Sequence, residues 1–167
     1  VITVNHNLRE KKETEGDAEF VQSYCKKMNI HCKRVDIPRG DILKQAEARN
    51  IGVEAAGREA RYNIFADFAK EFNVSHICLA HNKNDQVETV LMRFLHGSGS
   101  ESLSGIPMKR DLYIRPLLNV GRSDIEYYLE LQKIEYCTDK TNFSDEMTRN
   151  NLRINILPKL RKYPQEE

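Results

Sequence analysis

Two kinds of apolar pattern alternate along the first half of the chain. Short continuous apolar runs predict strands at 1–6, 31–37 and 75–80. Apolar residues with a 3.6-residue period predict helices between and after them, at 17–28, 42–49, 53–72 and 85–95. Residues 7–16 are polar and are expected to form a loop, with Asp17 as the N-cap of the first helix. The alternation predicts an α/β fold, a Rossmann-like parallel sheet with helices on both faces.

The pattern changes after His96. A Gly-Ser loop follows, and two short extended pieces surround a turn at Arg110-Asp111. Ser123 and Glu126 have the spacing of a capping box, which predicts a helix to about Gln132. A final helix is expected over 146–160, weakened by Pro158. We therefore divide the chain into a domain at 1–118 and a small, mostly helical C-terminal extension at 119–167.

Composition changes this picture little. The 167 residues carry a net charge of +1, and no apolar run is long enough to span a membrane. The four cysteines form no Cys-x-x-Cys pair, which favours a reduced, cytoplasmic setting. Residues 147–163 contain five basic residues and no acid. This segment is either a phosphate-binding face or a solvated helix surface.

The junction at residues 81–89 is the strongest candidate site. It follows a predicted buried strand and opens a helix, and ligands bind at the carboxyl ends of strands in open α/β sheets. Asp85 and Glu88 are spaced as N-cap and N3 residues, so they could simply cap the helix. They could also hold Mg²⁺ against nucleotide phosphates or accept a proton. His81 is either a structural residue or a ligand.

Two further groups of residues allow two interpretations each. Arg58, Arg61 and Tyr62 lie on the predicted helix 53–72, with Arg61 at the edge of its apolar stripe. An arginine there either pairs with a carboxylate or reaches a phosphate. Gly97 and Gly99 either end the preceding helix or allow a ligand to approach the backbone closely.

Six segments in order along the chain carry recognisable motifs. They are Val4 to Arg9, Glu54 to Tyr62, Ala80 to Thr89, Arg115 to Leu118, Asp139 to Asn142, and Arg149 to Arg153. They resemble the patterns H-x-x-H-x-L-R, E-x-A-x-R-x-x-R-Y, A-H-x-x-x-D-Q-x-E-T, R-P-L-L, D-x-[ST]-N and R-N-x-x-R of the bacterial tRNA(Ile)-lysidine synthetases, which belong to the PP-loop ATPase superfamily. The resemblance implies a fold like that of the adenine nucleotide alpha hydrolases.

The resemblance also implies a reaction. Family members use ATP and Mg²⁺ to adenylate the wobble cytidine of an isoleucine tRNA, and free lysine then displaces AMP. By this resemblance Asp85 and Glu88 would serve the metal, the phosphates or the lysine amine, and Arg61 would stabilise phosphate charge. We therefore expect His81, Asp85 and Glu88 to line one cleft at the carboxyl ends of the strands, with Arg61 facing them. The same comparison places further residues near substrate or ATP and allows a homodimer. These further residues are His81, Arg58, Gly97, Gly99, Arg149, Asn150 and Arg153.

Two departures from the family pattern matter. The S-G-G-x-D-S phosphate loop belongs upstream of Val1 and is absent, so we expect the chain as given to be inactive. The glycine loop has His96 and Ser102 where the family favours arginine and glycine. The alternatives are another PP-loop enzyme such as a tRNA thiolase, whose paired catalytic cysteines are missing, or a noncatalytic tRNA-binding remnant.

Overall fold

The computed structural model describes residues 1–8, 11–97, 99–137, 151–160 and 162. The chain forms two compact units, Val1–Ile77 and Cys78–Glu167. The predicted domain division at residues 118 and 119 stays a prediction. Among the described residues, no helix is both long and apolar enough to cross a membrane.

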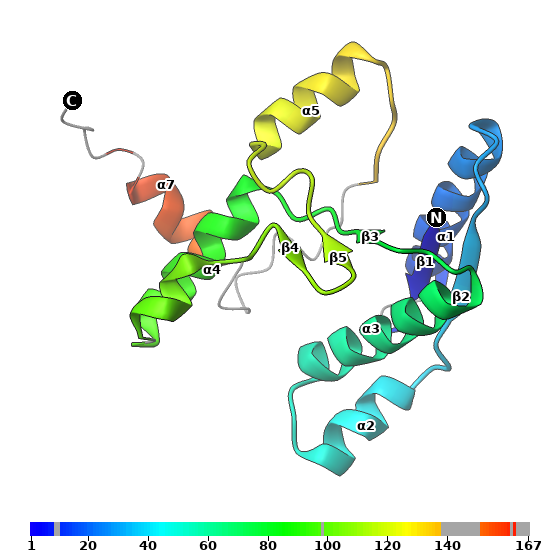
Figure 1. Ribbon diagram of the computed structural model, residues 1–167, viewed down its shortest axis with the longest axis horizontal. Coiled ribbons are helices and arrows are strands. Elements are labelled where there is room, and N and C mark those ends of the chain that lie inside the picture. Colours follow the sequence, from blue (N-terminus) through cyan, green and yellow to red (C-terminus); the bar gives the residue numbers. More distant parts are fainter. Residues whose placement is uncertain (9–10, 98, 138–150, 161, 163–167) are drawn as a thin grey trace. The chain divides into compact units, whose positions relative to one another are not determined.

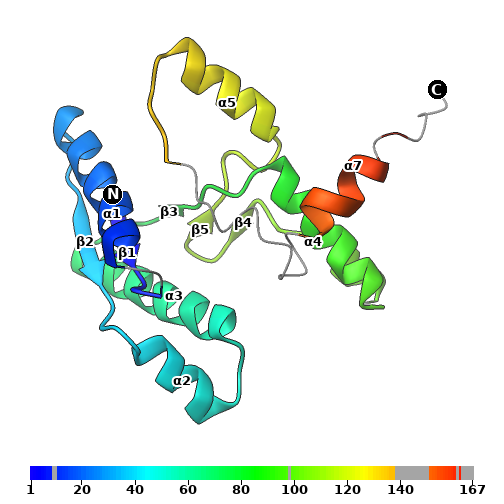
Figure 2. The ribbon, with the colours of Figure 1, turned by 180° about the vertical axis from the view of Figure 1, so that it is seen from behind.

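The first unit is a parallel strand pair with helices. Strand β1 (Ile2–Asn5) pairs in parallel with β2 (Lys33–Asp36), and helix α1 (Lys11–Lys27) connects them (Figure 1). Parallel strands need a crossover of this kind, because a tight turn can join only antiparallel neighbours. Helices α2 (Asp41–Arg49) and α3 (Val53–Glu71) follow and lie side by side in both ribbon views (Figure 2).

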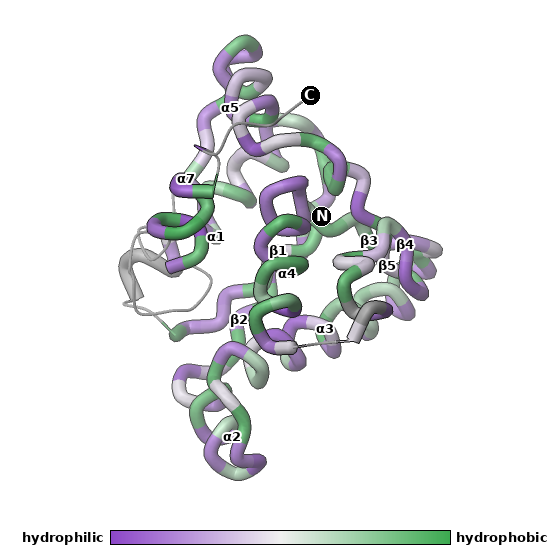
Figure 3. Tube along the Cα trace, turned by 90° about the vertical axis from the view of Figure 1, so that its left-hand side faces the viewer, coloured by the Kyte–Doolittle hydropathy of each residue, from purple (hydrophilic) through white to green (hydrophobic). Residues whose placement is uncertain are grey.

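The core of the first unit is apolar. Ile37, Ile42, Ala46 and Ala56 form its buried cluster, against which β1 and α3 pack further apolar side chains. Helix α2 carries both apolar and polar residues (Figure 3), and its buried residues Ile42 and Ala46 both belong to the cluster. At the end of α2 the backbone N–H of Asn50, in the left-handed conformation, donates to the carbonyls of Ala46 and Glu47.

The second unit is built around helix α4 (Lys83–Leu95). It also contains a small sheet with the strand order β3 (Ile77–Cys78), β5 (Tyr113–Ile114), β4 (Lys109–Arg110). β4 and β5 are antiparallel, which confirms the turn that the sequence predicted at Arg110-Asp111. In this turn Asp111 has φ 53°. The remaining elements are η1 (Ser100–Ser104), α5 (Arg122–Leu131), the π-helical turn η3 (Leu152–Ile156) and α7 (Leu157–Leu160).

The fold class is confirmed as α/β with a parallel strand pair, but two expectations were wrong. The first helix begins at Lys11, so Asp17 lies inside it rather than at its cap. The residues Lys-Lys-Glu-Thr-Glu are mostly good helix formers, so a polar run at this point does not exclude a helix. The expected strand 75–80 is reduced to β3, which pairs with β5 and belongs to a different sheet from β1.

The end of the chain agrees with the sequence only in part. The final predicted helix is described from residue 151 onwards, and its earlier residues lie outside the described ranges. It contains a π-helical turn in which the Leu157 N–H donates to the carbonyl of Leu152, five residues back. Pro158 follows directly and has no N–H, so it cannot donate a hydrogen bond to the preceding turn.

Candidate active site

The start of α4 is fixed by a capping box three residues earlier than the spacing of Asp85 and Glu88 predicted. Asn82 is the N-cap, and its Oδ1 accepts hydrogen bonds from the N–H groups of Asn84 (2.9 Å) and Asp85 (3.2 Å). Asp85 is the N3 residue, and its Oδ2 accepts from the Asn82 N–H at 2.8 Å. The capping role of Asp85 is therefore real, but it uses one carboxylate oxygen only.

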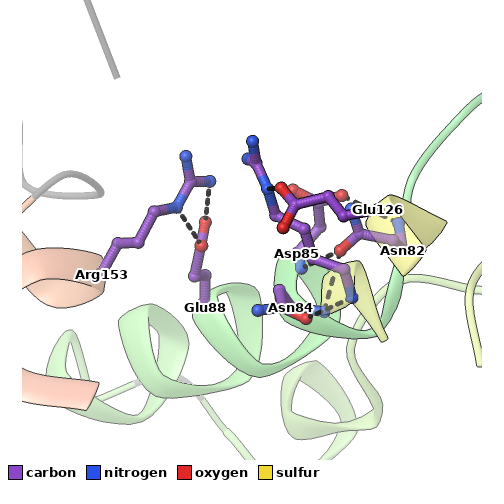
Figure 4. Close-up of polar contacts among 7 residues, drawn as sticks. Asn82, Asn84, Asp85, Glu88, Glu126 and Arg153 are labelled. Carbon is purple, nitrogen blue, oxygen red and sulfur yellow. Dashed lines mark hydrogen bonds and ion pairs between the residues drawn. The ribbon is translucent and has the colours of Figure 1, made fainter. Parts of the chain in front are cut away.

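Glu88 is not part of this cap. Its side chain is buried, with 2% exposed, and it forms a bidentate ion pair with Arg153 of η3 (Figure 4). The Arg153 Nε donates to Oε1 at 2.7 Å and Nη2 donates to Oε2 at 3.0 Å. The hydrogen bonds that Arg153 donates to Glu88 raise the pKa of Arg153, and the negative charge of Asp85 acts in the same direction. Two carboxylates and one guanidinium thus gather beside the first two turns of α4.

A third contact holds the start of α4 to the start of α5. Asn84 Oδ1 accepts a hydrogen bond from the Arg122 N–H at 3.1 Å, and the Lys83 N–H donates to the Val120 carbonyl at 2.9 Å. At α5 the N-cap is Gly121 rather than Ser123, and Asp124 Oδ2 accepts from its N–H at 3.2 Å. Glu126 instead forms an exposed ion pair with Arg122. Two helix starts therefore lie together, each with an aspartate at N3.

Arg61 and Arg58 belong to the first unit. Arg58 lies over the ring of Tyr62, with 4.9 Å from its guanidinium carbon to the ring centroid, and donates to the Tyr62 hydroxyl. Burial lowers the pKa of Arg61, and the neighbouring charge of Arg58 lowers it further. Among the described residues no carboxylate forms an ion pair with Arg61. Because Arg61 lies in the other unit, its predicted approach to Asp85 stays a prediction.

The structure describes three of the five remaining candidate site residues, which are His81, Gly97 and Gly99. His81 is half-buried and lies just before the cap of α4. Gly97 has φ 69°, and its N–H donates to the Phe94 carbonyl, so it ends α4 as the sequence allowed. A Cβ on Gly97 or Gly99 would meet no atom within 4 Å, so neither shows a close backbone approach among the described residues. Arg149 and Asn150 lie outside the described residues.

A groove of about 840 Å³ lies along a different face of α4. It is lined by residues of α4, of α7 and of the segment that opens α5, including Val87, Leu91, Asn119 and Leu157. Asp85, Glu88 and His81 are not among its lining residues. The expectation of a single cleft containing these three residues and facing Arg61 therefore stays a prediction.

Three polar residues that contact the segment 105–107 were not predicted as functional residues from the sequence. Gln86 and Arg93 extend from α4, and Arg115, with 4% exposed, extends from the end of β5. Two signals were present in the sequence, because Gln86 lies inside the D-Q-x-E-T motif and Arg115 opens the R-P-L-L motif. What the motifs do not reveal is the partner of each side chain.

Comparisons with known proteins identify the family of this chain and several of its relatives. The PP-loop domain matches residues 1–160. The tRNA(Ile)-lysidine synthase of Treponema denticola is 46% identical over 160 residues, which are 96% of this chain and 35% of that protein. That of Clostridium tetani is 42% identical over 156 residues, or 93% of this chain and 32% of that protein. The chain therefore spans about a third of the length of these relatives.

A solved structure shares the fold. The U34-tRNA thiolase NcsA from Methanococcus maripaludis, with its [4Fe-4S] cluster, superposes with a TM-score of 0.74. The match covers 96% of this chain and 55% of that one, at 18% sequence identity, so it supports the architecture alone. With the PP-loop domain matched over nearly its whole length, the chain belongs to the PP-loop domain family.

Proposed function

We propose that the protein containing this chain modifies tRNA with ATP, ligating lysine to the wobble cytidine of an isoleucine tRNA. The observation that carries the proposal is the 46% identity to a tRNA(Ile)-lysidine synthase over 96% of this chain. This reaction needs four ligands, which are ATP, Mg²⁺, free lysine and the tRNA. We propose that it takes place in the cytoplasm.

The reaction has two displacements. The C2 oxygen of the cytidine attacks the α-phosphorus of ATP, the bond to the β-phosphate oxygen breaks, and pyrophosphate leaves. The lysine amine then attacks C2, the bond from C2 to the adenylate oxygen breaks, and AMP leaves while the amine loses a proton. Both steps develop negative charge on phosphate oxygens, so positioned cations are the main requirement.

Asp85 is the residue we assign to the metal or to the lysine amine. Its Oδ2 accepts the Asn82 N–H, while Oδ1 forms no hydrogen bond with another described residue. Mg²⁺ keeps several waters and takes only one or two carboxylates beside substrate phosphates. One free oxygen on a rigid helix start fits that demand. A bound Mg²⁺ would supply charge neutralisation at the phosphates.

Arg153 is the residue we assign to phosphate charge, and Glu88 is its positioning residue. Both oxygens of Glu88 are engaged by Arg153, which leaves Glu88 poorly suited to ligate a metal in this arrangement. A bidentate contact fixes the plane of the guanidinium and limits the rotamers that it must lose on binding substrate. The 31% exposure of the Arg153 side chain lets it meet a ligand.

The other predicted site residues complete the proposal. Arg61 has the character of an anion-binding group, because it is half-buried and forms no ion pair with a described carboxylate. Lys159 and Lys162 are exposed and would contact tRNA phosphates. The remaining residues are proposed to contact ATP or tRNA, and a homodimer is compatible with this scheme. These residues are His81, Arg58, Gly97, Gly99, Arg149 and Asn150.

The decisive experiment measures transfer of labelled lysine to an isoleucine tRNA transcript by the gene product that contains this chain. Omitting ATP or replacing the wobble cytidine with uridine should abolish transfer. Incorporation of sulfur instead of lysine would favour the thiolase alternative. Binding of tRNA without either modification would favour the noncatalytic remnant.

A matched pair of variants separates chemistry from capping. Asp85→Asn keeps an oxygen for the Asn82 N–H but removes the negative charge. The activation barrier should therefore rise by several kcal/mol, and turnover should fall roughly a thousandfold while the fold stays intact. Asp124→Asn makes the same change at N3 of α5 and should leave turnover unchanged. Equal turnover in both variants would return Asp85 to a purely capping role.

A further inference from the structure

Three successive backbone carbonyls, those of residues 105 to 107, are held by three side chains. Arg93 Nη1 donates to the Gly105 carbonyl at 2.8 Å. Gln86 Nε2 donates to the Ile106 carbonyl at 3.3 Å, and Gln86 Oε1 accepts from the Ile106 N–H at 2.6 Å. Arg115 Nη1 donates to the Pro107 carbonyl at 2.8 Å. We refer to residues 105–107 as the clamped segment.

The contacts of the clamped segment come from two fixed elements. Gln86 and Arg93 are seven residues apart, two turns of α4, and therefore share one face of that helix. Arg115 is anchored through its own backbone, because its N–H donates to the Met108 carbonyl at 2.9 Å. The segment is thereby tied to α4 on one side and to the end of β5 on the other.

Gly105 shows how closely the segment approaches α4. It is buried with φ 76°, and a Cβ there would lie 2.6 Å from Gln86 Nε2. The Gln86 carboxamide could move aside, but only by giving up its hydrogen bonds to Ile106. Glycine at 105 is therefore required by the contact as well as by the backbone conformation.

The buried position of Arg115 indicates that this arrangement has a cost. Its side chain is 4% exposed, and its Nε is buried with no hydrogen-bond partner among the described residues. A buried guanidinium that is only partly satisfied is unfavourable for folding. Such a group is retained more readily where the geometry that it enforces is useful.

We propose that Gln86 is a positioning residue, which fixes the clamped segment to the helix that carries Asp85 and Glu88. The kinetic consequence rests on the proposed lysine-ligating function, whereas the clamp itself does not. Because α4 carries both the carboxylates and the clamp, a displaced segment would disturb the geometry of the reacting groups.

The first test measures hydrogen exchange at the Ile106 amide in the chain with Gln86→Met. Methionine keeps the length of the side chain and removes both hydrogen-bonding atoms. Exchange should accelerate about tenfold, because the only described acceptor of this N–H is lost. Gly105→Ala should reproduce the acceleration by displacing Gln86.

Two controls separate the clamp from general effects. Gln45→Met makes the same exchange of side chain on the exposed face of α2 and should leave the Ile106 amide unchanged. Gly40→Ala is the control for Gly105→Ala. It introduces the same kind of backbone strain, at φ 87°, where a Cβ would meet no atom within 4 Å, and it should leave the exchange rate of the Ile106 amide unchanged. An Ile106 amide that exchanges at the wild-type rate in Gln86→Met would overturn the proposal.

The second test measures kcat and the KM for lysine in the gene product that contains this chain. Gln86→Met should lower kcat about tenfold to a hundredfold and leave the KM for lysine nearly unchanged. Gln86→Glu retains the acceptor for the Ile106 N–H and should recover part of the loss. Loss of folded protein alone would change neither the kcat of the folded fraction nor the order of these variants.

The two possible failures are distinguishable. If the wild-type protein transfers no lysine, the proposed function fails, while the exchange rates still decide whether the clamp exists. If the wild-type protein is active and the methionine and glutamate variants turn over equally fast, the positioning role is overturned.

Discussion

The two units of this chain are stabilised in different ways. In the first unit the buried cluster consists of aliphatic side chains around Ile42, which is 1% exposed. In the second unit the described buried residues include the polar residues Glu88, Thr89 and Arg115 as well as three leucines. The first unit therefore depends mainly on apolar burial, and the second depends on polar groups that must find particular partners.

The difference teaches where function can be placed. Apolar packing tolerates substitutions that conserve volume, because dispersion and burial are not directional. Buried polar pairs tolerate few changes, because an unpartnered charge is costly. The carboxylates Asp85 and Glu88 and the clamped segment all lie in the unit that depends on directional contacts. Four predictions test this contrast, from the largest expected effect to the smallest.

Removing one member of the buried ion pair should have the largest effect. Arg153→Met leaves the Glu88 carboxylate buried and unpaired, so the free energy of unfolding should fall by about 3–5 kcal/mol. Far-UV circular dichroism during urea titration measures this, since the chain has no tryptophan. Arg122→Met breaks the exposed pair with Glu126 and should cost less than about 1 kcal/mol. Equal losses would contradict the distinction between buried and exposed pairs.

A cavity in the apolar cluster tests the first unit. Ile42→Ala should lower the free energy of unfolding by about 2–5 kcal/mol, from lost burial and an unfilled cavity. Leu43→Ala, at a neighbouring position with 48% exposed, should change stability by only about 0.5 kcal/mol. In the Ile42→Ala variant, amide hydrogen exchange should accelerate in the first unit. Acceleration confined to the second unit would break the contrast.

Loss of the N-cap of α4 should have an intermediate effect. Asn82→Ala removes the acceptor for two backbone N–H groups and should cost about 0.5–2 kcal/mol, measured by the same urea titration. Asn82→Ser supplies another good cap and should restore most of the stability. If serine is no better than alanine at this position, the cap contributes little and the helix start is held by its other contacts.

The smallest expected effect concerns pH and the first unit. Hydrogen bonds from Arg34, and then from Asn5, hold the pKa of Asp36 below its usual value. The stabilisation is therefore fully present above the unfolded-state pKa of about 3.9 and is lost as the pH falls through the lower folded-state pKa. For a pair this exposed, we expect less than about 1 kcal/mol.

Urea midpoints measured from about pH 6 to about pH 3 check this expectation. Asp36→Asn should flatten the acid dependence slightly, whereas Asp67→Asn, at an exposed position on α3, should not. An identical acid dependence in the wild type and Asp36→Asn would show that the pair with Arg34 contributes nothing.

Local structure could be predicted well from the sequence where one pattern dominates. The periods in α2, α3 and α4 give these helices to within about two residues, and the turn at Asp111 follows from its short polar sequence. The start of α1 was missed because its first turns are polar on all sides. The cap of α4 was assigned to Asp85 although Asn82 is an equally good N-cap, and spacing alone does not choose between them.

The sequence by itself determined the alternation of strands and helices, the family motifs and the identity of Asp85 and Glu88 as candidate residues. Only the tertiary structure decided that Glu88 pairs with Arg153, 65 residues away, and that Gln86 holds Ile106, 20 residues away. The physical reason is that periodicity records which side of an element is buried, over a few turns of chain. The partner of a buried polar group depends on loop paths and side-chain directions, which no local pattern contains.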